Sequence, residues 1–313
     1  MTSPARRGLP HPDGRALVLA GAGAAGNAWE LGLVAGLAEG GVDVTRAELV
    51  IGTSAGSTVA AQITSGTSPD ELYAAAAAEL PPHAGAARRE RPPGSPGTPG
   101  TRRGATVSGP SYLEWSDAII ASASDPADLR RRLGAAALEL ASTAGPDPSR
   151  WRDVVASRLP SHEWPSQDVR IVAVDARTGE LVVFDRSSGV DLVDAVAAST
   201  SAMKPYPIGE KRYLNGGYRR SENADLANGF GRVLVMSPFS GRSRMPSRWG
   251  MDLATQVAEL RAAGSTVETV FPDDRSGDVF DANALDPATR PQAARGGHTQ
   301  GLELAEHVGH FWA

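Results

Sequence analysis

Residues 16–26 read ALVLAGAGAAG, and this stretch decides the fold of the chain. Its apolar beginning is typical of a buried strand, and the glycines that follow favour a tight turn into a helix. The pattern G-x-G-x-x-G at 21–26 is the turn that seats a dinucleotide pyrophosphate on a helix N-terminus. The same turn also presents backbone N–H groups to the oxyanion of an acyl-transfer reaction. The glycines alone leave both interpretations open.

A second unit of the same kind lies at 47–57, which reads AELVIGTSAGS. Its apolar run ends in a sharp turn and leads into another helical stretch. Strand, turn and helix in alternation predict a parallel sheet, and therefore an α/β fold with a mostly parallel central sheet flanked by helices. Further strands are predicted at 169–176, 180–185, 232–238 and 265–272, and further helices within 111–158, at 191–199, around 250–263 and at the C-terminal end.

The composition excludes several classes of protein. The chain has 313 residues, a formal net charge of -5 and no cysteine. Disulfide frameworks, thiolate nucleophiles and zinc held by sulfur are therefore excluded, and no global positive field indicates a nucleic-acid partner. The first 15 residues lack the apolar core of a signal peptide, and nowhere do 18 consecutive apolar residues occur. We expect a soluble, cytoplasmic protein.

The chain is expected to form one domain at 15–313, preceded by a disordered tail at 1–14. Within that domain, 82–109 is rich in proline, glycine and arginine and poor in apolar residues, so we expect a disordered insertion. Its arginines make it a basic arm. The arm is interpreted either as a solvated insertion or as a mobile lid that meets an acidic lipid or acyl-carrier partner.

The motif GTSAG at 52–56 separates the two interpretations of the first turn. G-x-S-x-G between a buried strand and a helix is the setting of a nucleophile elbow, which lifts a serine hydroxyl, here that of Ser54, clear of the sheet. A dinucleotide fold instead requires an Asp or Glu at the end of the second strand to hold ribose. Because Ser54 stands there, acyl chemistry is favoured over nicotinamide chemistry. The alternative for GTSAG is a glycine-bounded turn with an incidental serine.

With the block RYLNGGYRRSENADLA at 212–227 added, the sequence resembles the patatin-like phospholipase family. The resemblance implies a three-layer α/β fold, no cofactor or metal, and a Ser–Asp dyad that hydrolyses a lipid or other acyl ester without a dedicated histidine. It implies that Ser54 is the nucleophile and that residue 215 is the base. The backbone N–H groups of Gly21, Ala22, Gly23 and Ala24 would form the oxyanion hole, and the motif glycines are Gly26, Gly52, Gly56, Gly216 and Gly217.

Three positions depart from the family pattern. Ala22 replaces a glycine, Ala25 replaces an arginine or lysine, and Asn215 replaces the catalytic aspartate. A carboxamide cannot take the serine proton, so ester hydrolysis should be weakened by about 10²–10⁴-fold. Three interpretations of Asn215 stay open: an engineered or natural variant with weakened hydrolysis, acyl transfer or thioester processing that needs less base assistance, and slow deamidation that restores an aspartate. The alternative to an enzyme is an acyl-binding or interaction protein that kept the fold and lost the base.

Other candidate groups are given structural roles. Lys204 could pair with Ser54, but a lysine before RYLNGG is more often a solvated rim residue. Asp225 is expected to be a helix cap or a structural hydrogen-bond acceptor. His307 and His310 lack a metal-binding signature and are expected on a surface helix, and the acidic turn at 272–278 lacks the pattern of a calcium loop.

Overall fold

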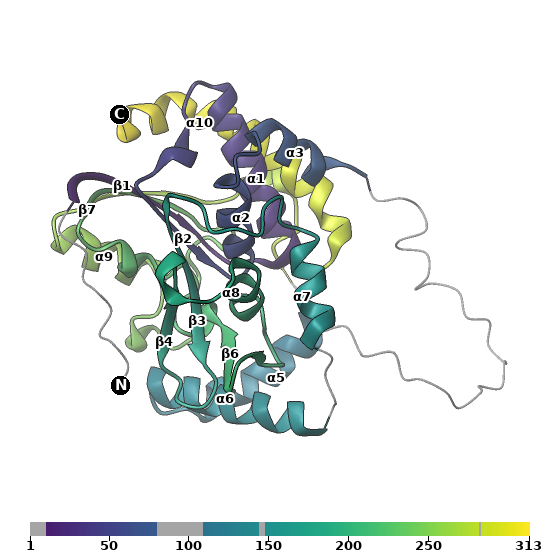
Figure 1. The fold of residues 1–313 in the computed structure, drawn as a ribbon. Coiled ribbons are helices and arrows are strands. Elements are labelled where there is room, and N and C mark those ends of the chain that lie inside the picture. Colours follow the sequence, from purple (N-terminus) through teal and green to yellow (C-terminus); the bar gives the residue numbers. More distant parts are fainter. Residues whose placement is uncertain (1–10, 80–108, 144–147, 282) are drawn as a thin grey trace.

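The computed structural model describes residues 11–79, 109–143, 148–281 and 283–313. These residues form an eight-stranded sheet in the order β5-β6-β3-β2-β1-β7-β8, with β4 paired to β3 (Figure 1). Strands β1, β2, β3, β7 and β8 pair in parallel, which confirms the predicted mostly parallel sheet. The strands are β1 (His11–Leu19), β2 (Leu49–Thr53), β3 (Asp168–Asp175), β4 (Leu181–Phe184), β5 (Tyr206–Ile208), β6 (Lys211–Asn215), β7 (Phe230–Met236) and β8 (Thr266–Val270).

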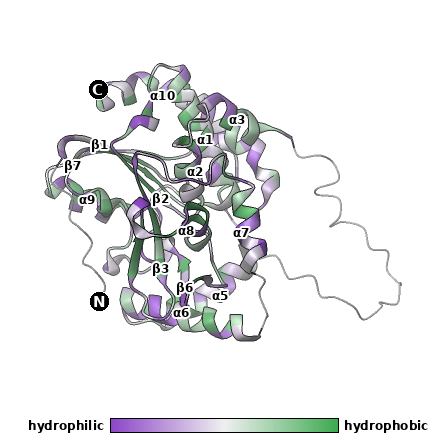
Figure 2. Ribbon diagram, viewed as in Figure 1, coloured by the Kyte–Doolittle hydropathy of each residue, from purple (hydrophilic) through white to green (hydrophobic). Residues whose placement is uncertain are grey.

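Alternate residues of the central strands enter two different cores, which makes the molecule three-layered. Leu17 and Leu19 of β1 face α1, α2, α8 and α10, whereas Ala16 and Val18 face α9. Both faces are covered, so successive residues are apolar in the buried parts of the central strands, such as Ala16–Leu19 of β1 and Val233–Met236 of β7 (Figure 2). The helices are α1 (Gly23–Glu39), α2 (Ala55–Ile63), α3 (Pro69–Ala77), α5 (Gly109–Ser122), α6 (Pro126–Thr143), α7 (Pro148–Ala156), α8 (Leu192–Ser199), α9 (Leu253–Ala262) and α10 (Arg290–Trp312).

Helices α1 and α10 approach each other closely along facing glycines. A Cβ atom on Gly36 would lie 2.1 Å from the carbonyl oxygen of His298, and one on Gly301 would lie 2.5 Å from that of Leu33. Such distances are far inside van der Waals contact, so the two backbones pack at a separation that only glycine permits. This contact fixes α1 on the sheet, with its N-terminus at the end of β1.

The predicted tail at 1–14 is wrong in its last four residues. Residues 1–10 lie outside the described residues, but β1 begins at His11. The His11 N–H donates to the carbonyl oxygen of Gly229 over 2.7 Å, and the imidazole stacks on Phe230 at a centroid distance of 5.2 Å. Pairing with β7 therefore orders a stretch whose composition resembles a tail.

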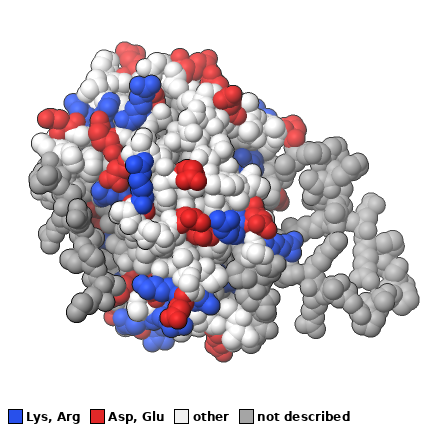
Figure 3. Space-filling view, in the orientation of Figure 1, with Lys and Arg blue, Asp and Glu red and all other residues white. Residues whose placement is uncertain are grey.

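The predicted insertion at 82–109 falls outside the described residues up to 108, and Gly109 begins α5. Helix α6 begins at Pro126, and Asp125 Oδ1 accepts the N–H groups of Ala127 and Asp128 in its first turn. No helix among the described residues is both long and apolar enough to cross a bilayer. Acidic and basic side chains are interspersed over the face shown in Figure 3.

Candidate active site

Ser54 lies between β2 and α2 in a backbone conformation that serine rarely adopts. Its φ is 55° and its ψ is -121°, outside the regions favoured by residues with a Cβ atom. The surrounding glycines permit this bend, because a Cβ on Gly56 would lie 2.2 Å from the carbonyl oxygen of Leu19. Such strain costs about 1–3 kcal/mol and persists only where neighbouring structure enforces it. The half-buried Ser54 side chain therefore stands at the N-terminus of α2, as the GTSAG motif predicts.

The register of β3 brings Asn215 to Ser54. Thr53, the last residue of β2, pairs with Val172, and Asn215, the last residue of β6, pairs with the next residue, Ala173. Strands β2 and β6 therefore end at successive positions of β3. This places Ser54, which follows β2, beside Asn215, which ends β6. Asn215 Nδ2 accordingly lies 2.8 Å from Ser54 Oγ and donates a hydrogen bond to it.

The orientation of the Asn215 carboxamide is fixed by Gly217. The Gly217 N–H can only donate, and it donates to Asn215 Oδ1 over 2.9 Å. The amide nitrogen must then point at the serine. Among the described residues, no carboxylate or imidazole hydrogen-bonds to Ser54 Oγ, and Lys204 makes no hydrogen bond or ion pair with it.

Ser199, at the end of α8, supports the backbone at Ser54. Its Oγ accepts the Ser54 N–H over 2.9 Å and donates to the carbonyl oxygen of Val172 over 2.6 Å. The hydroxyl thus ties Ser54 to β3, the strand with which β6, the strand of Asn215, also pairs. Sequence reasoning missed Ser199, because a serine at the end of a helix gives no signal of its role.

The turn at 21–24 lies against Ser54 and leaves its donors free. A Cβ on Gly21 would lie 2.6 Å from Ser54 Cβ, so the turn and the serine are in direct contact. Helix α1 begins at Gly23, which has a φ of 58°. None of the backbone N–H groups at 21–24 makes a hydrogen bond with another described residue. Four unpaired donors at a helix N-terminus form a site suited to a negatively charged oxygen.

The two alanines that depart from the family pattern fit their positions. Ala22 has a φ of -157°, so no glycine is required there. Ala25 is fully buried, and its N–H donates to the carbonyl oxygen of Ala284 over 3.0 Å.

Leu285, which follows Ala284, covers the turn at 21–24, since a Cβ on Gly23 would lie 2.6 Å from Leu285 Cδ2. Leu285 is nevertheless 42% exposed, which leaves an apolar side chain in solvent beside the turn.

Glu30 is a buried carboxyl group behind the same turn. It is 0% exposed, and neither of its carboxyl oxygens has a hydrogen-bond partner among the described residues. Burial raises the pKa of Glu30 well above its usual value, and the nearby backbone amide of Ala20 opposes that shift only in part. Burial therefore favours the uncharged carboxyl group of Glu30. A buried acid at this position was not predicted from the sequence.

Asp225 is a structural acceptor, as expected. It accepts hydrogen bonds from Arg219 at 2.9 and 2.6 Å and forms an ion pair with Arg220 at 3.4 Å. Burial alone would raise the pKa of Asp225, but the two guanidinium groups outweigh burial and lower it. These pairs anchor the segment that follows Asn215.

The other candidate groups take part in surface ion pairs. His307 lies 3.1 Å from Glu268, and Arg275 bridges Asp273 at 2.9 Å and Glu303 at 2.6 Å. Asp273 also caps the short helical turn that follows it. No group of three or more His, Asp or Glu side chains within the described ranges is arranged to hold a metal ion.

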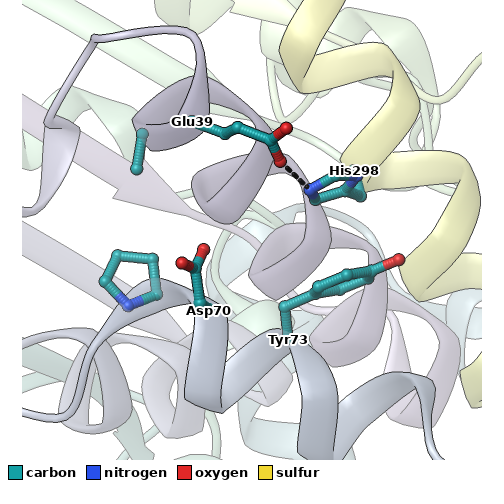
Figure 4. A pocket seen from close by; sticks show the side chains of 6 residues that line it. Glu39, Asp70, Tyr73 and His298 are labelled. Atoms are coloured by element: carbon teal, nitrogen blue, oxygen red, sulfur yellow. Dashed lines mark ion pairs between the residues drawn. The ribbon is translucent and has the colours of Figure 1, made fainter.

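A cavity of about 390 Å³ lies at the other end of α1, between α1, α3 and α10 (Figure 4). Glu39 pairs with His298 over 3.0 Å, and the imidazole stacks on Tyr73 at a centroid distance of 4.3 Å. Glu39 lies ~24 Å along the helix axis from Gly23, given the rise of an α-helix. The cavity is therefore separate from Ser54.

Comparisons with known proteins relate the chain to two solved structures and to one protein family. Among solved structures, the chain is similar to VipD from Legionella pneumophila, with 13% identity, a TM-score of 0.44, and coverage of 95% of this chain and 68% of VipD. It is also similar to the type III effector protein ExoU, with 18% identity, a TM-score of 0.39, and coverage of 95% of this chain and 54% of ExoU. No curated protein matches the sequence at a significant level. A family model described as patatin-like phospholipase matches residues 17–228, more than half of the sequence, and the chain belongs to that family.

Proposed function

We propose that the protein is a serine acyl hydrolase that cleaves a lipid or another acyl ester through an acyl-enzyme on Ser54. Family membership supports lipid acyl hydrolysis in general terms. The observation that carries the assignment to Ser54 is its strained position at the start of α2, in contact with Gly21 and hydrogen-bonded by Asn215. Strain retained in a half-buried serine beside unpaired N–H groups is typical of a catalytic elbow.

In the proposed reaction, Ser54 Oγ bonds to the acyl carbon and the carbonyl oxygen takes up negative charge. The free N–H groups at 21–24 donate to that oxygen, which lies near them because Gly21 touches Ser54. Each such donor is typically worth about 2.7–4 kcal/mol of barrier. The alcohol then departs, and water releases the acyl group from Ser54.

The serine proton takes an unusual route in this scheme. Asn215 Nδ2 donates to Ser54 Oγ, and it does not accept a proton because the lone pair of an amide nitrogen is delocalised into the carbonyl group. The proton therefore leaves to water or to the departing oxygen. Substrates with good leaving groups, such as activated esters and thioesters, need the least help with that transfer, so the site should favour them. Thioester processing and acyl transfer are the alternatives that this feature supports.

Leu285 suggests where the acyl chain lies. It covers Gly23 and is 42% exposed, so it offers an apolar contact directly beside the proposed oxyanion donors. An alkyl chain that shields this side chain from water would gain about 25 cal/mol for each Å² of apolar surface buried. We place the acyl chain along Leu285.

Labelling with a fluorophosphonate probe tests the proposal. We expect the probe to phosphonylate Ser54 in the wild-type protein, with the modified peptide located by mass spectrometry, and Ser54→Ala to remain unlabelled. Ser240→Ala is the matched control, because Ser240 also has a positive φ of 56° but lies on an exposed turn. Equally poor labelling of the wild type and Ser54→Ala would reject Ser54 as a nucleophile and favour a protein that only binds acyl groups.

A further inference from the structure

We propose that Asn223 is a positioning residue that holds Ser54 and Asn215 together. The proposal rests on the function proposed above. Asn223 is 0% exposed and has a φ of 55°, the left-handed conformation that asparagine tolerates better than most residues. It follows the short segment after Asn215 and precedes the helical turn at Ala224–Ala227.

The Asn223 carboxamide bridges the two chain segments that end in the site. Its Nδ2 donates to Thr53 Oγ1 at 3.1 Å and to the carbonyl oxygen of Gly216 at 3.2 Å. Thr53 directly precedes Ser54, and Gly216 directly follows Asn215. The Asn223 side chain therefore contacts one residue adjacent to Ser54 and one residue adjacent to Asn215.

The orientation of this carboxamide is enforced from its other side. Arg219 Nη1 donates to Asn223 Oδ1 over 2.9 Å, and a guanidinium group can only donate. Arg219 is itself held by Asp225 at 2.9 and 2.6 Å. The amide nitrogen is thus forced toward Thr53, Gly216 and the carbonyl oxygen of Arg220, which lies 2.7 Å away.

This bridge supplements the register of β3. Strands β2 and β6 both pair with β3, and Asn223 links their ends directly through side-chain hydrogen bonds. Without the bridge, only the pairing with β3 holds the end of β2 and the end of β6, so each end can move independently of the other. Misplacement of a reacting group by about 1 Å can cost about 10²-fold in rate, so loss of the bridge should lower kcat.

The test uses Asn223→Gly, which removes the carboxamide while suiting the positive φ. With a p-nitrophenyl ester we expect kcat to fall about tenfold or more, with KM unchanged and the melting temperature little altered. Asn223→Asp keeps the shape and the contact with Arg219 but loses the donor, and it should show the same loss. Asn228→Asp is the control, because Asn228 is exposed on the same segment, and its kcat should equal that of the wild type.

A second measurement does not depend on activity. In a crystal structure of Asn223→Gly we expect the distance from Ser54 Oγ to residue 215 Nδ2 to exceed hydrogen-bonding range, against 2.8 Å in the parent protein. An unchanged distance, or a kcat within twofold of the wild type, would overturn the positioning role. A lengthened distance in a protein whose Ser54 proves unreactive would retain the positioning role and reject the proposed function.

Discussion

Asn215 donates a hydrogen bond to the hydroxyl of Ser54 over 2.8 Å. A carboxylate at the same place would accept a hydrogen bond from that hydroxyl and could remove its proton. The distance between the two side chains is therefore that of a hydrogen-bonded serine and carboxylate, but the direction of the hydrogen bond is reversed. The backbone N–H of Gly217 enforces the reversal, so rotation of the carboxamide does not relieve it.

Asn215→Asp should increase the hydrolysis of short-chain esters. An aspartate at this position can accept the serine proton, and general-base catalysis is typically worth about 10²–10⁴-fold in rate. The measurement is kcat/KM with p-nitrophenyl butyrate, for the wild type and the variant side by side. The double variant Ser54→Ala, Asn215→Asp should be inactive. An unchanged rate in Asn215→Asp would show that residue 215 is not at the base position or that another group acts as base.

Deamidation of Asn215 would imitate this variant and must be measured in the wild-type protein. Asn215 precedes glycine, whose backbone nitrogen attacks the side-chain carbonyl carbon of asparagine in deamidation. The Asn215 carboxamide is, however, hydrogen-bonded to Ser54 and to Gly217, and both hydrogen bonds must break before that attack. We expect Asn215 to persist in the folded protein on storage. Peptide mass analysis of aged samples checks this, and activity that grows together with a one-dalton increase at Asn215 would show the opposite.

Ser54→Gly should be more stable than Ser54→Ala. Both variants lose the hydrogen bond with Asn215, but only glycine adopts a φ of 55° and a ψ of -121° without steric cost. We expect a difference of about 1 kcal/mol or more in the free energy of unfolding. Urea denaturation of the two variants measures it. Equal midpoints would mean that the backbone at Ser54 is not strained in solution.

Glu30→Gln should change how stability depends on pH. Burial raises the pKa of Glu30 in the folded protein, so between the pKa of the unfolded chain and the higher folded pKa only the native state retains this proton. The stabilising contribution of the proton is present below the unfolded pKa and is lost as pH rises toward the folded pKa, by up to about 1.4 kcal/mol for each pH unit. A glutamine at position 30 is uncharged at every pH, so the Glu30→Gln variant does not lose stability in this way as the pH rises.

Urea denaturation between pH 4 and pH 8 tests this expectation. Relative to the wild type, Glu30→Gln should gain stability as pH rises through that range. Glu306→Gln, the same change on an exposed helical position, should follow the wild type at every pH. If the curves of Glu30→Gln and the wild type run parallel, Glu30 ionises as readily in the folded protein as in the unfolded chain.

Gly301→Ala should destabilise the protein although alanine is the better helix former. The new Cβ would lie 2.5 Å from the carbonyl oxygen of Leu33, and α1 and α10 must separate to accommodate it. Overpacking of this kind costs about 1–3 kcal/mol, more than the helix propensity returns. Gly309→Ala is the control in the same helix, because its Cβ would meet no backbone atom and only the Cγ2 methyl group of Val42, at 3.2 Å. Thermal unfolding should show a lower midpoint for Gly301→Ala alone.

The sequence predicted the α/β class and the location of Ser54, because local signals carry both. Apolar runs that end in glycine turns specify strand and helix, and GTSAG specifies the bend at Ser54. The nearness of Asn215 to Ser54 followed only from family resemblance, since the register of β3 is not visible in either segment. The roles assigned to the N–H groups at 21–24 stay predictions, although no residue in the described part of the chain accepts a hydrogen bond from them.

The residues that sequence reasoning missed act through contacts between distant segments. Asn223 reaches Thr53 across 170 positions of sequence, and Ser199 reaches Ser54 across 145. Glu30 is buried on a helix that local pattern alone would not mark as enclosed on all sides. In the sequence, the glycines of α1 and α10 indicate only weak helix formation. Their role in the close packing of the two helices is evident only from the structure. Each role depends on a partner that no local window contains.

The pairing of β1 with β7 means that the stretch recognisable as the family signature is not a unit that can fold by itself. The family model ends at residue 228, and β7 begins at Phe230. A chain cut after Asn228 would leave β1 as an unpaired edge of the sheet, and such edges promote aggregation. It would also lack α10, the helix that packs against α1. Any exchange of catalytic segments between relatives must therefore carry the remainder of the chain through α10 along with them.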